Sequence, residues 1–148
     1  MWLSGWPKAE SVLLFAPWPS AVLDSEGLWA VARNEESARV VLASSRAAGV
    51  PVLVPVAVLA ESLYGDERDA RLNQVVKRLQ ITDVTESLAR SAAELKRLAG
   101  MTGGPATIDA IVVAVSVAAG GGVILTSDVG DINHLAECCS VRVRAVRV

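Results

Sequence analysis

The chain has 148 residues, of which 52% are hydrophobic, and a formal net charge of −2. This length suits one domain with a single core, and the slightly acidic balance excludes a general basic surface for coating nucleic acid, while metal-mediated contact with phosphate stays open. The only two cysteines, Cys138 and Cys139, are adjacent and poorly placed for a loop-closing disulfide. We therefore expect a reducing compartment, the cytoplasm.

Two apolar segments raise the question of a signal peptide or a membrane-spanning helix. We expect residues 1–19 to form an N-terminal extension and residues 20–148 the domain. The apolar core of the extension is short and no convincing cleavage site follows it, so a signal peptide is disfavoured. The long apolar stretch 110–127 contains three glycines that divide it into a helix and a strand, so we expect no membrane segment.

The first half of the chain alternates between strand and helix patterns. Apolar runs predict strands at 20–24 and 50–55. Helical periodicity predicts helices at 35–49 and 56–65, each of which ends in a glycine. A further amphipathic segment follows at 67–79.

The second half continues this alternation and ends on a strand. The expected elements, in chain order, are a strand at 80–84, helices at 85–100 and 106–120, a strand at 122–127, a helical segment at 129–139 and a strand at 141–146. Helices of this length between strands imply parallel crossovers. We predict an α/β fold, a three-layer α/β/α sandwich around a central, mainly parallel sheet.

Four acidic residues stand at notable positions in this pattern. Asp24 closes the first strand and Asp128 follows the fourth, so both belong to the carboxyl edge of the sheet, where such folds bind ligands. Asp109 and Glu61 are each the only charge in a long uncharged stretch. A buried carboxylate costs several kcal/mol unless a partner compensates it.

Each acid also has a structural explanation. Asp24 and Asp128 could cap the helices that follow them, and Asp109 lies in a first helical turn, where the dipole contributes only about 0.3–1 kcal/mol. Glu61, inside its expected helix, could form a hidden salt bridge. One shared explanation for all four acids is simpler, namely a bound Mg²⁺ or Mn²⁺ ion. Such an ion prefers oxygen ligands and offsets the repulsion between neighbouring carboxylates. Zinc is disfavoured because the single His134 and the adjacent cysteines lack its ligand spacing.

At these residues the sequence resembles the PIN-domain ribonucleases, and most closely the VapC toxins of bacterial toxin-antitoxin pairs. The resemblance covers about residues 20–148 and rests on the order and spacing of four segments, AVLDSEGL, VPVAVLAES, ATIDAIVVAVSVAAG and VILTSDVGDINHL. It implies a catalytic, metal-binding set formed by Asp24, Glu61, Asp109 and Asp128. It also implies that Asp131 is an additional metal ligand through water and that Thr126 orients the cluster. Glu26 stands where the family usually has Ser or Asn, so it either adds a carboxylate or faces solvent.

The resemblance also implies an activity and partners. The expected activity is that of a Mg²⁺- or Mn²⁺-dependent endoribonuclease toxin that cleaves structured RNA such as tRNA or rRNA. The expected partners are a cognate VapB-like antitoxin and a second copy of the chain in a homodimer, in keeping with apolar residues left over on the helices around 37–45 and 71–79.

Three alternatives compete with this activity. A receiver-type phosphoacceptor would need a lysine from a late strand, and the last lysine is Lys96. A haloacid-type phosphatase would need D-x-D where the chain has DSE. A noncatalytic PIN-like binding protein with a degenerate acidic site stays open.

Overall fold

The computed structural model describes residues 18–148. At its centre lies one sheet of five parallel strands, in the spatial order β3 (Gln80–Thr82), β2 (Val52–Pro55), β1 (Ala21–Leu23), β4 (Gly122–Thr126) and β5 (Val143–Arg147). The two central strands β1 and β4 are buried along their whole length. Such burial is typical of a parallel sheet that helices cover on both faces.

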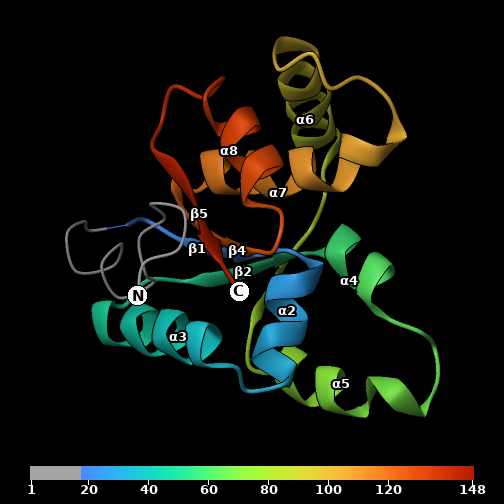
Figure 1. The fold of residues 1–148 in the computed structure, drawn as a ribbon, viewed down its shortest axis with the longest axis vertical. Helices are drawn as coiled ribbons and strands as arrows, with labels where there is room; N and C mark the ends of the chain where they lie inside the picture. Colours follow the sequence, from blue (N-terminus) through green and yellow to red (C-terminus); the bar gives the residue numbers. More distant parts are fainter. Residues whose placement is uncertain (1–17) are drawn as a thin grey trace.

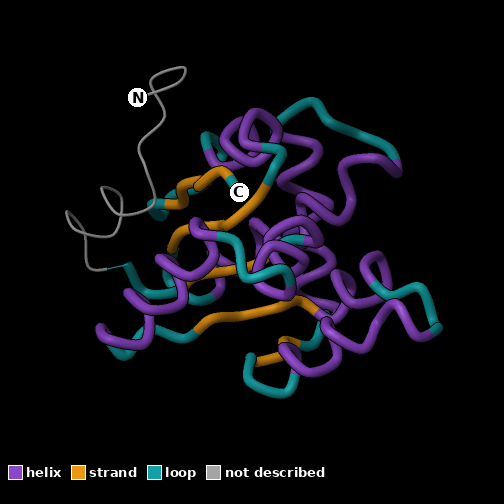
Figure 2. The backbone as a smooth tube through the Cα atoms, turned by 60° about the horizontal axis from the view of Figure 1, so that its bottom comes forward, coloured by secondary structure: helices purple, strands orange, loops and turns teal. Residues whose placement is uncertain are grey.

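Helices cover both faces of this sheet (Figure 1). The helices on one face are α2 (Ser25–Ala32), α3 (Glu36–Ala48) and α5 (Ala70–Val76), and those on the other are α6 (Glu86–Leu98), α7 (Thr107–Ala118) and α8 (Val129–Ala136). Figure 2 shows the strands, in orange, between these helices from a second direction. The predicted three-layer α/β/α sandwich with a parallel sheet is confirmed.

Helix α4 (Val56–Ser62) follows β2 without a loop and contacts both α2 and α7. It therefore joins the two helical layers at the carboxyl edge of the sheet. Two short 3₁₀ turns, Glu67–Asp69 and Gly104–Ala106, precede α5 and α7.

The core is centred on α7 and the middle strands. Residues 110–116 of α7 are all buried, because the helix is apolar on every side and lies between the sheet and the helices α6 and α8. Trp18, which the sequence assigned to the extension, is 6% exposed and belongs to this core. The guanidinium carbon of Arg142 lies 4.2 Å from the centre of its ring. Residues 1–17 of the expected extension lie outside the described residues.

Several expected element boundaries differ from the structure. The extent of helix α2 was not predicted, although Asp24 was considered as a helix cap, since the sequence SEGLWAVA has no polar face and includes Gly27. The helix expected at 56–65 ends at Ser62, and the segment expected at 67–79 is a 3₁₀ turn followed by α5. All five predicted strands are present. Within residues 18–148, no helix has the length and apolar character needed to cross a bilayer.

Candidate metal centre

Asp24 and Asp128 lie where the two central strands end. Asp24 follows β1 and caps α2, with its Oδ1 accepting a hydrogen bond of 2.7 Å from the backbone N–H of Gly27. Asp128 caps α8 through a weaker bond of 3.4 Å from the N–H of Asp131. Both are therefore helix caps, as the structural explanation proposed, and both also line the hollow described below.

Asp109 reaches the same edge from the opposite layer. It is in the first turn of α7 and is partly buried. Carboxylate oxygens of Asp109, Asp128 and Asp131 all lie within 4.8 Å of one another. Burial, which is the largest cause, and the negative charges of Asp128, Asp24, Asp131 and Glu61 together raise the pKa of Asp109 to about 7. The charged groups that act on the Asp109 carboxylate are therefore all acidic.

Glu61 is held at the site by a hydroxyl. The side chain of Ser25, the first residue of α2, donates a hydrogen bond to Glu61 Oε1. Glu61 is exposed near the end of α4 and does not lie in a helix interior, as the longer expected helix implied. The hidden salt bridge considered for it is not found among residues 18–148.

These side chains surround one hollow of about 380 Å³. Its charged lining consists of one basic residue, Arg33, and five acidic residues, namely Asp24, Glu26, Glu61, Asp109 and Asp128. Glu26, whose role the sequence left open, is exposed at this hollow. Arg33 can balance only one of these five carboxylates, so the remaining excess of negative charge favours a bound positive ion.

Thr126, at the end of β4, supports two of the acids. Its Oγ1 accepts a 2.9 Å hydrogen bond from the N–H of Asp128, and its side chain is hydrogen-bonded to Asp24. Burial raises the pKa of Asp24, while the hydrogen bonds of Thr126 and Gly27 oppose this rise and the charges of Glu26 and Glu61 add to it. The buried Thr126 thus connects Asp24 and Asp128.

The donor set fits a hard divalent cation. Oxygens that share one ion at 2.0–2.6 Å lie no more than about 4–5 Å apart, and the carboxylates of Asp109, Asp128 and Asp131 meet this condition. These three residues would hold Mg²⁺ or Mn²⁺ most directly. Asp24 and Glu61 line the same hollow without belonging to this tight group. The sequence had placed Asp131 further out, as a ligand through water.

Comparison with known proteins identifies the fold and the family. Residues 21–137 match the PIN domain family, which is most of the chain. The chain belongs to the PIN-domain family. Its structure is similar to a chain in the crystal structure of VapBC2 from Rickettsia felis bound to a DNA fragment from their promoter, with a TM-score of 0.63, 16% sequence identity, and coverage of 84% of this chain and 97% of that chain. No curated protein matches the sequence.

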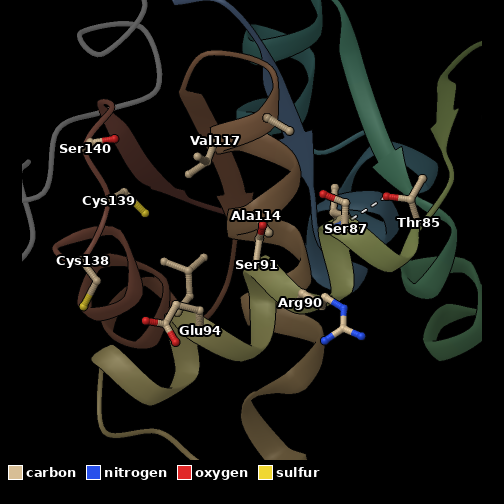
Figure 3. Close-up of a pocket in the computed structure, with 13 residues that line it drawn as sticks. Thr85, Ser87, Arg90, Ser91, Glu94, Ala114, Val117, Cys138, Cys139 and Ser140 are labelled. Carbon is tan, nitrogen blue, oxygen red and sulfur yellow. Dashed lines mark hydrogen bonds between the residues drawn. The ribbon is translucent and has the colours of Figure 1, made fainter.

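The PIN domain has a second hollow, of about 590 Å³, between α6, α7 and the segment that follows α8 (Figure 3). Cys138 and Cys139 lie at one end of it, and Thr85 at the other. Both cysteines are free. The charged lining consists of Arg90 and Glu94 alone, so this hollow lacks an acidic cluster. His134 is exposed and its Nε2 lies 2.7 Å from the carbonyl oxygen of Ala99, away from any metal-binding group in residues 18–148.

Sequence reasoning missed several residues around the acidic hollow. Trp29, Ser62 and Tyr64 line it together with the acids. Trp29 and Tyr64 lie far apart in the sequence, so no signal there indicated that their rings share a site. Asp69 is also buried, and nothing in the sequence distinguished it from the exposed charged residues that precede it.

Proposed function

We propose that this PIN domain is a metal-dependent endoribonuclease of the VapC toxin type that cleaves structured RNA such as tRNA or rRNA. The observation that carries the proposal is the convergence of Asp24, Glu61, Asp109 and Asp128 on one hollow, with Asp131 beside it. Phosphodiester hydrolysis needs positive charge near the phosphate, and this hollow is built to concentrate cations.

The acids divide into two groups by their surroundings. Asp109, Asp128 and Asp131 would hold Mg²⁺ or Mn²⁺, which supplies a bound water of lowered pKa and neutralises charge on the phosphate when present. Asp24 is fixed by Gly27 and Thr126, and burial raises its pKa. We assign it the task of orienting the attacking water, since a carboxylate with a raised pKa is a better proton acceptor.

The proposal includes two protein partners. The structural similarity to a chain of a VapBC complex supports a VapB-like antitoxin that neutralises this chain. We also propose a homodimer, in which two copies pair about a two-fold axis. Light scattering at micromolar concentration tests the dimer, and co-purification with the product of the neighbouring gene tests the antitoxin. A strictly monomeric protein that retains no such product would contradict both.

A cleavage assay on total tRNA tests the activity. The parental chain should cut RNA with Mn²⁺ and stop when EDTA is added, and Asp109→Asn should not cut. Asp83→Asn is the matched control, because Asp83 is exposed and lines neither hollow. If the parental chain binds no Mn²⁺ and cuts no RNA, the noncatalytic alternative holds instead.

A further inference from the structure

One lysine of the PIN domain is bound to neutral oxygens and to no acid. Lys96 lies in the last turn of α6 and is partly buried. Its Nζ donates hydrogen bonds of 3.0 Å to the carbonyl oxygen of Gly103 and of 3.0 Å to Thr107 Oγ1. It forms no ion pair among residues 18–148. Holding so long a side chain in one conformation costs up to about 2 kcal/mol of entropy, so these two contacts need an explanation.

The contacts of Lys96 fix the segment that leads into α7. We call residues 99–106, which join α6 to α7, the connector. Gly100 and Gly103 in the connector have positive φ angles of 67° and 107°, and glycine gives a chain much conformational freedom where nothing else holds it. The residue before α7 is Ala106, which provides no side-chain cap. Lys96 therefore supplies side-chain hydrogen bonds at the start of α7 that its own cap residue lacks.

The start of α7 carries an acid of the candidate metal centre. Thr107 is the first residue of α7 and Asp109 is the third, so the hydrogen bond from Lys96 acts two residues from the Asp109 carboxylate. That carboxylate meets those of Asp128 and Asp131, which lie at the start of α8. Helices α6, α7 and α8 form one layer (Figure 1). The metal centre thus depends on how the first turns of α7 and α8 are placed relative to each other.

The other end of the connector is bound to α8. His134 Nε2, from α8, lies 2.7 Å from the carbonyl oxygen of Ala99. The connector is therefore attached to α8 at Ala99 and, through Lys96, to both α6 and the first residue of α7. These contacts join the two helices whose first turns bring Asp109, Asp128 and Asp131 together.

We propose that Lys96 is a positioning residue, which fixes the first turn of α7 and so holds the Asp109 carboxylate at ion-binding distance from Asp128 and Asp131. This inference rests on the proposed metal-dependent function and adds a residue that lines neither hollow. In the metal-free protein the like charges of the other acids repel Asp109. Lys96 opposes this displacement through Thr107 and the main chain, without a hydrogen bond to Asp109 itself.

Binding of Mn²⁺ alone tests the role of Lys96 apart from catalysis. The EPR signal of free Mn²⁺ is lost on binding, and it is titrated well below the Tm of each protein. The proteins are the full chain, Lys96→Met, Thr107→Val, Thr107→Ser, the double variant of Lys96→Met with Thr107→Val, and Lys77→Met. Lys77 is the matched control because it is exposed and lines neither hollow. Amide hydrogen exchange of residues 99–109 in EDTA follows the start of α7 without metal.

We expect Lys96→Met to bind Mn²⁺ about tenfold more weakly. This is the lower end of the loss that follows removal of a partner of a metal ligand, since Lys96 acts through the helix. The Mn²⁺ concentration for half-maximal cleavage of total tRNA should rise by the same factor, and residues 99–109 should exchange faster in EDTA. Thr107→Val should lose affinity in the same direction, and the double variant should lose less than the two single losses multiplied together, because both changes break one contact. Thr107→Ser, which keeps the hydroxyl, and Lys77→Met should stay within about twofold.

Two results would overturn the inference while leaving the nuclease function intact. One is a Lys96→Met variant whose Tm in EDTA falls while its Mn²⁺ affinity is unchanged, which would make Lys96 a stabilising residue only. The other is an equal loss of affinity in Thr107→Ser and Thr107→Val, and this pair decides the question if Lys96→Met does not fold. A full chain that binds no Mn²⁺ would overturn the inference together with the metal site. A full chain that binds Mn²⁺ and cuts no RNA would instead reject the nuclease function, and weaker Mn²⁺ binding by Lys96→Met would still support the role of Lys96.

Discussion

At the scale of single residues, the charge of Asp109 determines how the site responds to pH. The pKa of Asp109 is raised to about 7 in the folded protein, against 3.8 for an unperturbed aspartate. Between these two values the folded state binds more protons than the unfolded state. The free energy of unfolding of the metal-free protein should therefore fall as the pH rises from about 4 to about 7 and then level off, so far as Asp109 is concerned.

Urea unfolding in EDTA at a series of pH values checks this dependence. Asp109→Asn should remove the fall in stability over that interval, since the amide does not titrate, and should be at least as stable as the parent at pH 8. Asp83→Asn should retain the parental profile. A substantial loss of stability in Asp109→Asn at pH 8 would instead indicate a structural role, such as an ion pair or cap worth about 1–3 kcal/mol.

Mn²⁺ should relieve the same repulsion. An ion that binds only the folded state stabilises it by about 2.7 kcal/mol at a concentration 100 times its Kd. We expect Mn²⁺ to raise the Tm of the parent and to raise that of Asp109→Asn much less. Thermal melts with Mn²⁺ and with EDTA measure the difference, and an equal rise in both proteins would remove Asp109 from the metal site.

Much of the acidic set could be predicted from the sequence, and its environment could not. Asp109 and Glu61 were identifiable because a lone charge in an apolar stretch needs a partner. The hydrogen bond from Ser25 to Glu61 joins positions 36 residues apart, and the hydrophobic periodicity of a sequence does not predict such a contact. Asp69 follows three other charged residues in a polar turn, so nothing in the sequence distinguished its buried carboxylate.

At the scale of elements, the contact between α2 and β4 positions Asp24. Gly27 lies so close to β4 that a Cβ atom there would overlap the carbonyl oxygen of Leu125. Gly27→Ala should therefore destabilise the protein by about 1–3 kcal/mol through overpacking and disturb the N–H that binds Asp24. Gly130→Ala in α8 is the matched control, since a Cβ atom there meets nothing within 4 Å.

Chemical denaturation of both glycine variants measures the contrast. Gly130→Ala should be neutral or stabilise the protein by up to about 1 kcal/mol, because alanine favours a helix over glycine. Equal effects of the two substitutions would show that α2 does not rest against β4 as described.

The segment between α4 and α5 depends on one buried carboxylate. Asp69→Ala leaves the N–H groups of Tyr64 and Gly65 without their acceptor, and we expect a loss of about 1–3 kcal/mol. Asp66→Ala, which removes an exposed partner of Arg68, should cost less than Asp69→Ala, because solvent screens an exposed ion pair. Urea midpoints of the two variants test this order, and a larger loss in Asp66→Ala would reverse the assignment.

At the scale of the whole molecule, the folded unit includes Trp18. Deleting residues 2–17 should leave the shift of Tm by Mn²⁺ unchanged, because all the acidic residues of the candidate metal centre are retained. Deleting residues 2–19 also removes Trp18 from the core and from Arg142, and should cost about 3–5 kcal/mol, the usual loss for a buried tryptophan. Unfolding curves of both truncations decide where the folded unit begins, and equal stability would place Trp18 outside it.

The architecture could be predicted because strand and helix patterns alternate along the whole domain, which leaves little choice besides a parallel sheet. The extent of helix α2 could not be predicted, since its sequence has no polar face and its stability comes from the Asp24 cap and from packing on β4. The end of α4 at Ser62 was also missed, because the apolar pattern continues through Leu63 while the chain turns away to meet Asp69. Tertiary contacts decided both boundaries.

The cluster of like charges also has a consequence for genetics. Most substitutions that inactivate a protein do so by lowering its stability and hence its abundance in the cell. Replacing Asp109 by an uncharged residue relieves the repulsion between the carboxylates, so such changes should inactivate the protein without lowering its amount. If expression of the chain arrests growth, survivors selected after random mutagenesis should fall into two groups. Those with scarce protein should carry changes spread over the core, and those with abundant protein should carry changes concentrated at the acidic hollow.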